Sequence, residues 1–125
     1  MADKIKVLIV DDQPLVLDIL SKGIAKDPGI EVVGTATDGY IALNVIPNLK
    51  PDVIILDMEM PRMNGIQFLH NLMPVNPIPT IVLSALTDKD SQVTDEAFNA
   101  GAVDFLKKPA SGSQGLPSLL VQLWT

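Results

Sequence analysis

Apolar and polar positions along the chain form two alternating kinds of segment. Short apolar runs, bounded by proline, glycine, aspartate or serine, predict buried strands at residues 5–10, 31–36, 53–57, 80–84 and 102–106. Between them, apolar residues recur every three or four positions and predict helices at residues 15–26, 41–46, 66–73 and 88–100. Strands that alternate with helices predict an α/β fold in which a parallel sheet carries helices on both faces.

The helical segments also predict which residues face the sheet. In the first helix, Leu20 and Ile24 share a face with either Val16 or Leu17, and in the last helix the inward residues are Val93, Ala97 and Phe98. Gly101 is expected to end that last helix, because glycine tolerates a left-handed C-cap. Residues 47–51 are expected to be a connection.

The end of the chain has a different composition from the rest. Residues 110–117 read ASGSQGLP, which is typical of a linker, and residues 118–124 would form only about two turns of helix. We therefore expect one domain at residues 1–109, followed by a linker-like segment with a short terminal helix at residues 110–125.

Composition narrows the function classes. The chain has 125 residues, of which 47% are hydrophobic and 19% charged, as in a folded domain. A net charge of −6 disfavours binding to nucleic acid or to an acidic membrane surface. The chain has no cysteine, which excludes disulfides, thiolate metal sites and a cysteine nucleophile. No apolar stretch has the length of a membrane span or signal peptide, so a soluble cytoplasmic domain is expected.

Polar side chains follow three of the predicted strands. Asp57 ends the run 53–57, Asp11 and Asp12 follow the first strand, and Ser84 ends the fourth. Ligands and chemistry gather at this carboxyl edge in open parallel sheets. Three converging carboxylates repel one another unless a cation is bound, and hard oxygen ligands suit Mg²⁺. The alternative for Asp11 or Asp12 alone is a helix cap.

Other residues carry weaker signals. Lys108 ends the fifth strand and could hold phosphoryl oxygens as a point charge, although strand-end lysines such as Lys107 are usually solvated. Ser84 could donate its hydroxyl to such an oxygen or serve only in a turn. Phe105 is either core or a partly exposed aromatic, and His70 lacks a second ligand at metal-binding spacing. Three methionines suggest packing or partner contact: Met58, Met60 and Met63.

Several other enzyme classes lack their motifs in this chain. It contains no GxGxxG, GxxxxGK[ST] or GxSxG sequence. A haloacid-dehalogenase-type phosphatase also uses a strand-end aspartate with Mg²⁺, and Glu59 stands where its acid/base aspartate would be, but its nucleophile normally follows the first strand. A flavodoxin-like mononucleotide binder needs a phosphate-cradling loop after the first strand, where this chain has Asp11 and Asp12 instead.

Taken together, the motifs resemble the receiver domain of two-component response regulators over residues 4–109. The matching segments, in the order of that family, are Val10-Asp11-Asp12, residues 56–65 (LDMEMPRMNG), Ser84-Ala85, Gly101-Ala102, Phe105 and Lys108-Pro109. The resemblance implies a flavodoxin-like, doubly wound, five-stranded parallel sheet with strand order 2-1-3-4-5 and a short last helix.

The resemblance also implies a role for each matching residue. Asp57 would accept a phosphoryl group from the phosphohistidine of a histidine kinase or phosphotransfer protein. Mg²⁺ would be held by Asp12, Asp57 and the backbone carbonyl of Glu59, with Asp11 acting through water. Ser84 and Lys108 would meet the phosphoryl oxygens. Residues assigned to the switch are Ser84 and Phe105, and the Lys108–Pro109 bond is expected to be cis.

A closer resemblance is to the receiver half of chemotaxis protein-glutamate methylesterases. It rests on residues 59–65, 84–87 and 101–109 and on the spacing from Ser84 to Lys108. This implies a C-terminal hydrolase as the output domain, which nothing in this chain matches, so a free-standing regulator of another pathway stays open. Two positions depart from the wider family: Phe105 replaces a tyrosine, and Glu59 places an acid two residues after Asp57, where with Leu86 it would tune phosphate lifetime.

Overall fold

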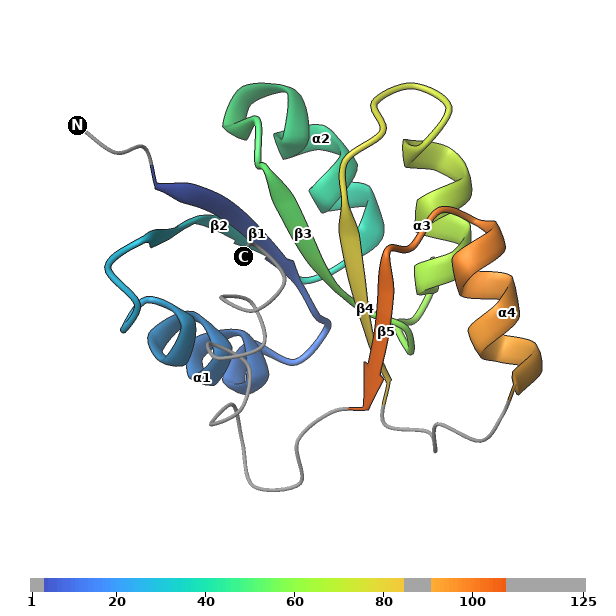
Figure 1. The fold of residues 1–125 in the computed structure, drawn as a ribbon, viewed down its shortest axis with the longest axis horizontal. Helices are drawn as coiled ribbons and strands as arrows, with labels where there is room; N and C mark the ends of the chain where they lie inside the picture. Colours follow the sequence, from blue (N-terminus) through green and yellow to red (C-terminus); the bar gives the residue numbers. More distant parts are fainter. Residues whose placement is uncertain (1–3, 85–90, 108–125) are drawn as a thin grey trace.

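The computed structural model of the chain describes residues 4–84 and 91–107. Five strands form one parallel sheet in the order β2-β1-β3-β4-β5 (Figure 1), which confirms the expected topology. The strands are β1 (Ile5–Val10), β2 (Ile30–Ala36), β3 (Val53–Asp57), β4 (Thr80–Ser84) and β5 (Asp104–Lys107). The helices are α1 (Pro14–Ile24), α2 (Gly39–Leu49), α3 (Gly65–Leu72) and α4 (Ser91–Asn99).

Helices cover both faces of the sheet, and alternation along the strands builds a separate core on each. On one face α2, α3 and α4 lie side by side (Figure 1), and Leu8, Leu56 and Val82 of the sheet pack against residues such as Ile46 and Phe68. On the other face lies α1, which packs against a second core. Because β1, β3 and β4 are central, most of their side chains are buried on both faces, as their nearly continuous apolar runs predicted.

Helix α1 differs slightly from its expected range. Its burial also decides whether Val16 or Leu17 faces the core. Leu17 is buried beside Leu20 and Ile24, whereas Val16 is only half-buried. The helix ends at Ile24 rather than at residue 26. A turn follows the helix, in which Oδ1 of Asp27 accepts a hydrogen bond of 2.8 Å from the N–H of Gly29.

Helix α2 corrects the expectation that residues 47–51 form a connection. The helix continues through Pro47 to Leu49. Proline costs one helical hydrogen bond but its fixed φ suits the helix, and Pro47 is exposed. Leu49 packs against the core, and its Cδ1 lies 2.6 Å from where a Cβ would stand on Gly34. Lys50, with φ of 50°, provides the left-handed end before Pro51.

Two expectations near β5 were wrong. Phe98 of α4 is 44% exposed and does not face the core, whereas Ala97 is fully buried. The fifth strand begins at Asp104 rather than at residue 102. Gly101 ends α4 as expected, with φ of 120°, and the N–H of Ala102 donates to the carbonyl of Ala97 at 3.0 Å, so this turn takes the residues assigned to the start of the strand.

Some expectations lie outside the described residues. They concern the start of the helix at residues 88–90, Lys108, the Lys108–Pro109 bond and the segment 110–125. Within the described part of the chain, every helix is too short or too polar to cross a membrane.

Candidate functional site

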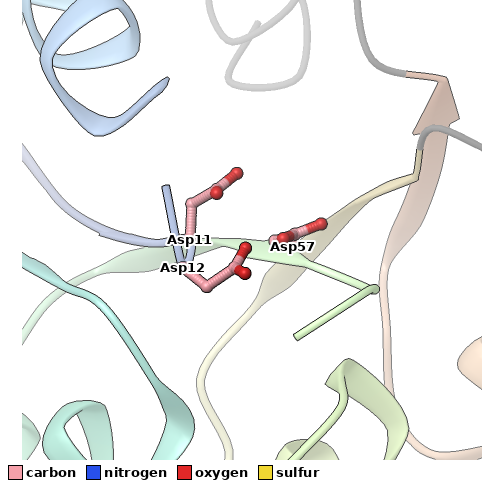
Figure 2. A group of neighbouring side chains, drawn as sticks. All are labelled: Asp11, Asp12 and Asp57. Carbon is pink, nitrogen blue, oxygen red and sulfur yellow. The ribbon is translucent and has the colours of Figure 1, made fainter. Parts of the chain in front are cut away.

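The carboxyl ends of β1, β3 and β4 lie next to one another and bring the predicted polar residues together. Asp57 is the last residue of β3 and pairs with Leu83 of β4, one residue before Ser84. Asp11 and Asp12 directly follow β1, which pairs with the other edge of β3. Figure 2 shows the three aspartates side by side at these strand ends. The prediction that these side chains follow neighbouring strands and meet at one edge of the sheet is thus correct.

The three carboxylates are close enough to share one cation. One oxygen from each of Asp11, Asp12 and Asp57 lies within 4.8 Å of the others. Oxygens on opposite sides of a Mg²⁺ ion stand about 4.2 Å apart, because each Mg–O bond is about 2.1 Å. A hard dication therefore fits this donor set with only small side-chain movements. The set also combines buried and accessible ligands, since Asp11 and Asp57 are 1% and 2% exposed and Asp12 is partly exposed.

The helix-cap alternative does not describe Asp11 or Asp12. The N-cap of α1 is Gln13, and its side chain makes no capping hydrogen bond. Oδ1 of Asp11 instead accepts a hydrogen bond of 2.9 Å from the N–H of Gln13, which closes a turn ahead of the helix. This turn fixes the Asp11 side chain beside the strand end.

Glu59 connects two strand ends. Its backbone N–H donates to Oδ1 of Asp57 at 3.2 Å. Its side-chain Oε2 accepts a hydrogen bond from the hydroxyl of Ser84, with an oxygen–oxygen distance of 2.5 Å. Ser84 is fully buried and Glu59 is partly exposed. The sequence placed both residues at this edge but did not reveal the bond between them.

The loop between β3 and α3 is packed rather than loosely solvated. Its three methionines, Met58, Met60 and Met63, are each at most 7% exposed and belong to the larger core, so packing explains them. Gly65 lets the loop close tightly, because a Cβ there would stand 3.1 Å from the Cα of Met58 and 3.2 Å from the carbonyl oxygen of Asp57.

Asp38 also holds this loop, a role that was not predicted from the sequence. Its Oδ1 caps α2 by accepting from the N–H of Ile41 at 2.8 Å, and its Oδ2 forms an ion pair with Arg62 of the loop. Asp38 is 5% exposed, and Arg62 adopts a left-handed backbone with φ of 67°. An aspartate before glycine at a helix start signals the cap, but the partner 24 residues away has no local signal.

Two further candidate residues, Phe105 and His70, lie on β5 and α3. Phe105 is partly buried on β5 and packs against the larger core. His70 is exposed on α3, in agreement with its interpretation as a helix-surface residue.

Comparison with known proteins identifies the family. The sequence profile of the response regulator receiver domain matches residues 7–119, most of the chain. The chain belongs to this family.

Two similar proteins are a methylesterase and the receiver domain of a CheB protein. A protein-glutamate methylesterase/protein-glutamine glutaminase of Syntrophotalea carbinolica is 54% identical over 124 residues, which are 98% of this chain but 35% of the relative. The chain thus spans about a third of that relative's length. The response regulator domain of Thermotoga maritima CheB is 41% identical with a TM-score of 0.86, over 97% of this chain and 94% of that one.

A second similar structure was solved with ligands. It is the complex of CheX, CheY, beryllofluoride and Mg²⁺ from Borrelia burgdorferi, with 31% identity and a TM-score of 0.77 over 94% of this chain and 84% of that one. The receiver assignment and the closeness to methylesterases are therefore confirmed. Nothing in these comparisons supports the haloacid-dehalogenase alternative.

Proposed function

We propose that this receiver domain accepts a phosphoryl group on Asp57 and controls the output of a chemotaxis protein-glutamate methylesterase. The observation that carries the proposal is the grouping of Asp57 with Asp11 and Asp12, whose carboxylate oxygens lie within 4.8 Å of one another. A single strand-end aspartate would suit many structural roles. Two further carboxylates beside it are costly unless a cation is part of the reaction.

The donor is the phosphohistidine of a histidine kinase or phosphotransfer protein. A carboxylate oxygen of Asp57 attacks the phosphorus in line, the new O–P bond forms, and the N–P bond breaks with its electron pair returning to the imidazole. Burial of Asp57 excludes water from one side of the new aspartyl phosphate. The hydroxyl of Ser84 is a donor for a phosphoryl oxygen, and Lys108 supplies a positive charge for the same oxygens.

Asp12, Asp57 and the backbone carbonyl of Glu59 would hold Mg²⁺, and Asp11 would act through a water ligand. When bound, this ion neutralises charge on the acceptor and on the transferring group. The proposal is supported by the all-oxygen donor set and by Mg²⁺ and beryllofluoride in the related complex from Borrelia burgdorferi.

The signal would leave through β4, β5 and α4. Phosphorylation draws Ser84 toward the phosphoryl group, and Phe105 takes the space that this movement opens. The surface that β4, β5 and α4 present to the partner then changes. A hydrolase domain is the proposed partner because the similar methylesterase is about three times as long as this chain.

The test is incubation with Mg²⁺ and acetyl phosphate, followed by intact-mass measurement beside the Asp57→Asn variant. We expect one Mg²⁺-dependent phosphoryl adduct on the wild-type protein and none on the variant. An adduct of equal size on the variant would refute the assignment of Asp57. Steady hydrolysis of acetyl phosphate that is lost in Glu59→Gln would instead indicate a phosphatase.

A further inference from the structure

Glu59 contacts both the acceptor and the hydroxyl proposed to move. Its backbone N–H donates to Oδ1 of Asp57, while its carboxylate accepts from the hydroxyl of Ser84 at 2.5 Å. These contacts lie on consecutive strands of the sheet, since Asp57 ends β3 and Ser84 ends β4. A single side chain thus reaches the residue on which the proposed switch depends.

The Glu59–Ser84 hydrogen bond and a bond from Ser84 to a phosphoryl oxygen are mutually exclusive. A serine hydroxyl carries one proton and donates it to one acceptor at a time. The bond to Glu59 has a carboxylate as acceptor and a fully buried donor, two conditions that strengthen a hydrogen bond. Donation to the phosphoryl group therefore requires that the bond to Glu59 be broken.

Phosphorylation itself works against this bond. The acyl phosphate carries about 1.5 to 2 negative charges, where the carboxylate of Asp57 carried one, at a position two residues from Glu59. The carboxylate of Glu59 is then repelled, while Ser84 gains a new acceptor. Unphosphorylated and phosphorylated forms would differ in which acceptor holds the Ser84 proton.

We propose that the carboxylate of Glu59 stabilises the unphosphorylated conformation by holding the hydroxyl of Ser84, and so opposes the switch. This inference rests on the proposed function and assigns to Glu59 a positioning role through Ser84. The Glu59 side chain stabilises one of two states, so its removal shifts their populations toward the phosphorylated conformation. Glu59 thereby sets how much phosphoryl-binding free energy is needed for the switch.

The experiment is a calorimetric titration of the protein with beryllofluoride, an analogue of the phosphoryl group, in saturating Mg²⁺. Four proteins form a double-mutant cycle: wild type, Glu59→Ala, Ser84→Ala and the double variant. We expect Glu59→Ala to tighten beryllofluoride binding about tenfold, the equivalent of one charge-assisted hydrogen bond. In the Ser84→Ala background the same substitution should change affinity less than about threefold, because the bond it removes is already absent.

Further variants separate the hydrogen bond from charge and from folding. Glu59→Gln keeps an acceptor oxygen without charge, so its affinity should lie between those of wild type and Glu59→Ala. Glu31→Gln removes a charge from an exposed position on β2 and should leave affinity unchanged. Circular dichroism checks that each variant is folded.

The possible outcomes are distinct. An equal gain from Glu59→Ala in both backgrounds would mean that only charge repulsion acts, and would overturn the inference. Unchanged or weaker binding by Glu59→Ala in the otherwise wild-type protein would overturn it as well. If the wild-type protein bound no beryllofluoride with Mg²⁺ and formed no phosphoryl adduct, the proposed function would fail, and the inference with it.

Discussion

Asp11 and Asp12 are neighbours in the chain but differ in burial and hydrogen bonding. Asp11 is 1% exposed and accepts the N–H of Gln13, so one of its oxygens already has a partner within the turn. Asp12 is partly exposed and can keep water on an ion that it binds. Mg²⁺ retains several waters in proteins, so an accessible carboxylate suits direct coordination better than one engaged in a turn.

This difference predicts unequal effects of neutralising the two residues. Asp12→Asn should weaken Mg²⁺ binding by about tenfold or more, because it removes the proposed direct ligand. Asp11→Asn should have a smaller effect, since it removes charge but keeps the Oδ1 acceptor for Gln13. Mg²⁺ affinity is measured by calorimetry, with the exposed Asp18→Asn as the control variant. Equal losses from both substitutions would mean that Asp11 binds the ion directly.

At the scale of single residues, the sequence predicted where the site residues lie better than it predicted which side chains bond to one another. A carboxylate that ends an apolar run marks a strand end, so the grouping of Asp11, Asp12 and Asp57 was predictable. The hydrogen bond that Glu59 accepts from Ser84 and the ion pair between Asp38 and Arg62 were not, because each depends on how one loop folds over a distant strand or helix. Long-range side-chain pairs leave no periodic trace in a sequence.

Among the elements, the loop between β3 and α3 has the most influence on the site. At its end α3 begins with a capping box, in which Asn64 and Gln67 exchange two hydrogen bonds of 2.9 Å. Partway along, Arg62 pairs with Asp38 at the start of α2. The loop that carries Glu59 is thus fixed to two helix starts, which favours a site that is formed before any ligand binds.

The two roles of Asp38 can be separated by substitution. Asp38→Ala removes the helix cap and the ion pair, so it should lower the free energy of unfolding by about 1–2 kcal/mol. Asp38→Asn keeps an oxygen for the N–H of Ile41 and should cost roughly half as much. Urea unfolding measures both. The matched control is Asp18→Ala, which removes an exposed pair with Lys22 on α1 and should change stability by less than about 0.5 kcal/mol. A loss from Asp38→Ala as small as that of the control would contradict the dual role.

Sequence patterns predicted the strands and helices well and their ends less well. The three central strands, β1, β3 and β4, have their expected ranges, and β2 begins one residue earlier than expected. Pro47 suggested a helix end, but packing of Leu49 outweighs the one lost hydrogen bond. Phe98 suggested a core residue on helical spacing, yet the narrow buried stripe of α4 is satisfied by the small Ala97 and the partly buried Val93.

At the scale of the whole molecule, the site places three negative charges at one edge of the sheet. Both hydrophobic cores pack against this sheet. Most side chains of β1 and all side chains of β3 are buried, and the three carboxylates stand at the carboxyl ends of these two central strands. Repulsion among Asp11, Asp12 and Asp57 is present in the folded chain and largely relieved in the unfolded one, so it lowers stability when no cation is bound. Ligand binding and global stability are therefore linked at this edge.

This linkage predicts that the stability order of wild type and Asp57→Asn reverses with Mg²⁺. In chelator the variant should melt at a higher temperature than wild type, because one of three mutually repelling charges is gone while the oxygen facing the N–H of Glu59 remains. At a Mg²⁺ concentration ten times its dissociation constant, wild type should gain about 1.4 kcal/mol, or roughly 5 °C in melting temperature.

The variant should gain less than about a third of that shift, because it lacks a ligand and binds Mg²⁺ more weakly. Melting is followed by circular dichroism, with sodium chloride at matched ionic strength as the control for charge screening. If Mg²⁺ raised both proteins equally, or if the sodium control reproduced the shift, the ion would be acting on the net charge of −6 rather than on the three aspartates. A crossing of the two melting temperatures that Mg²⁺ alone produces would tie stability to the carboxylate of Asp57, the proposed phosphoacceptor.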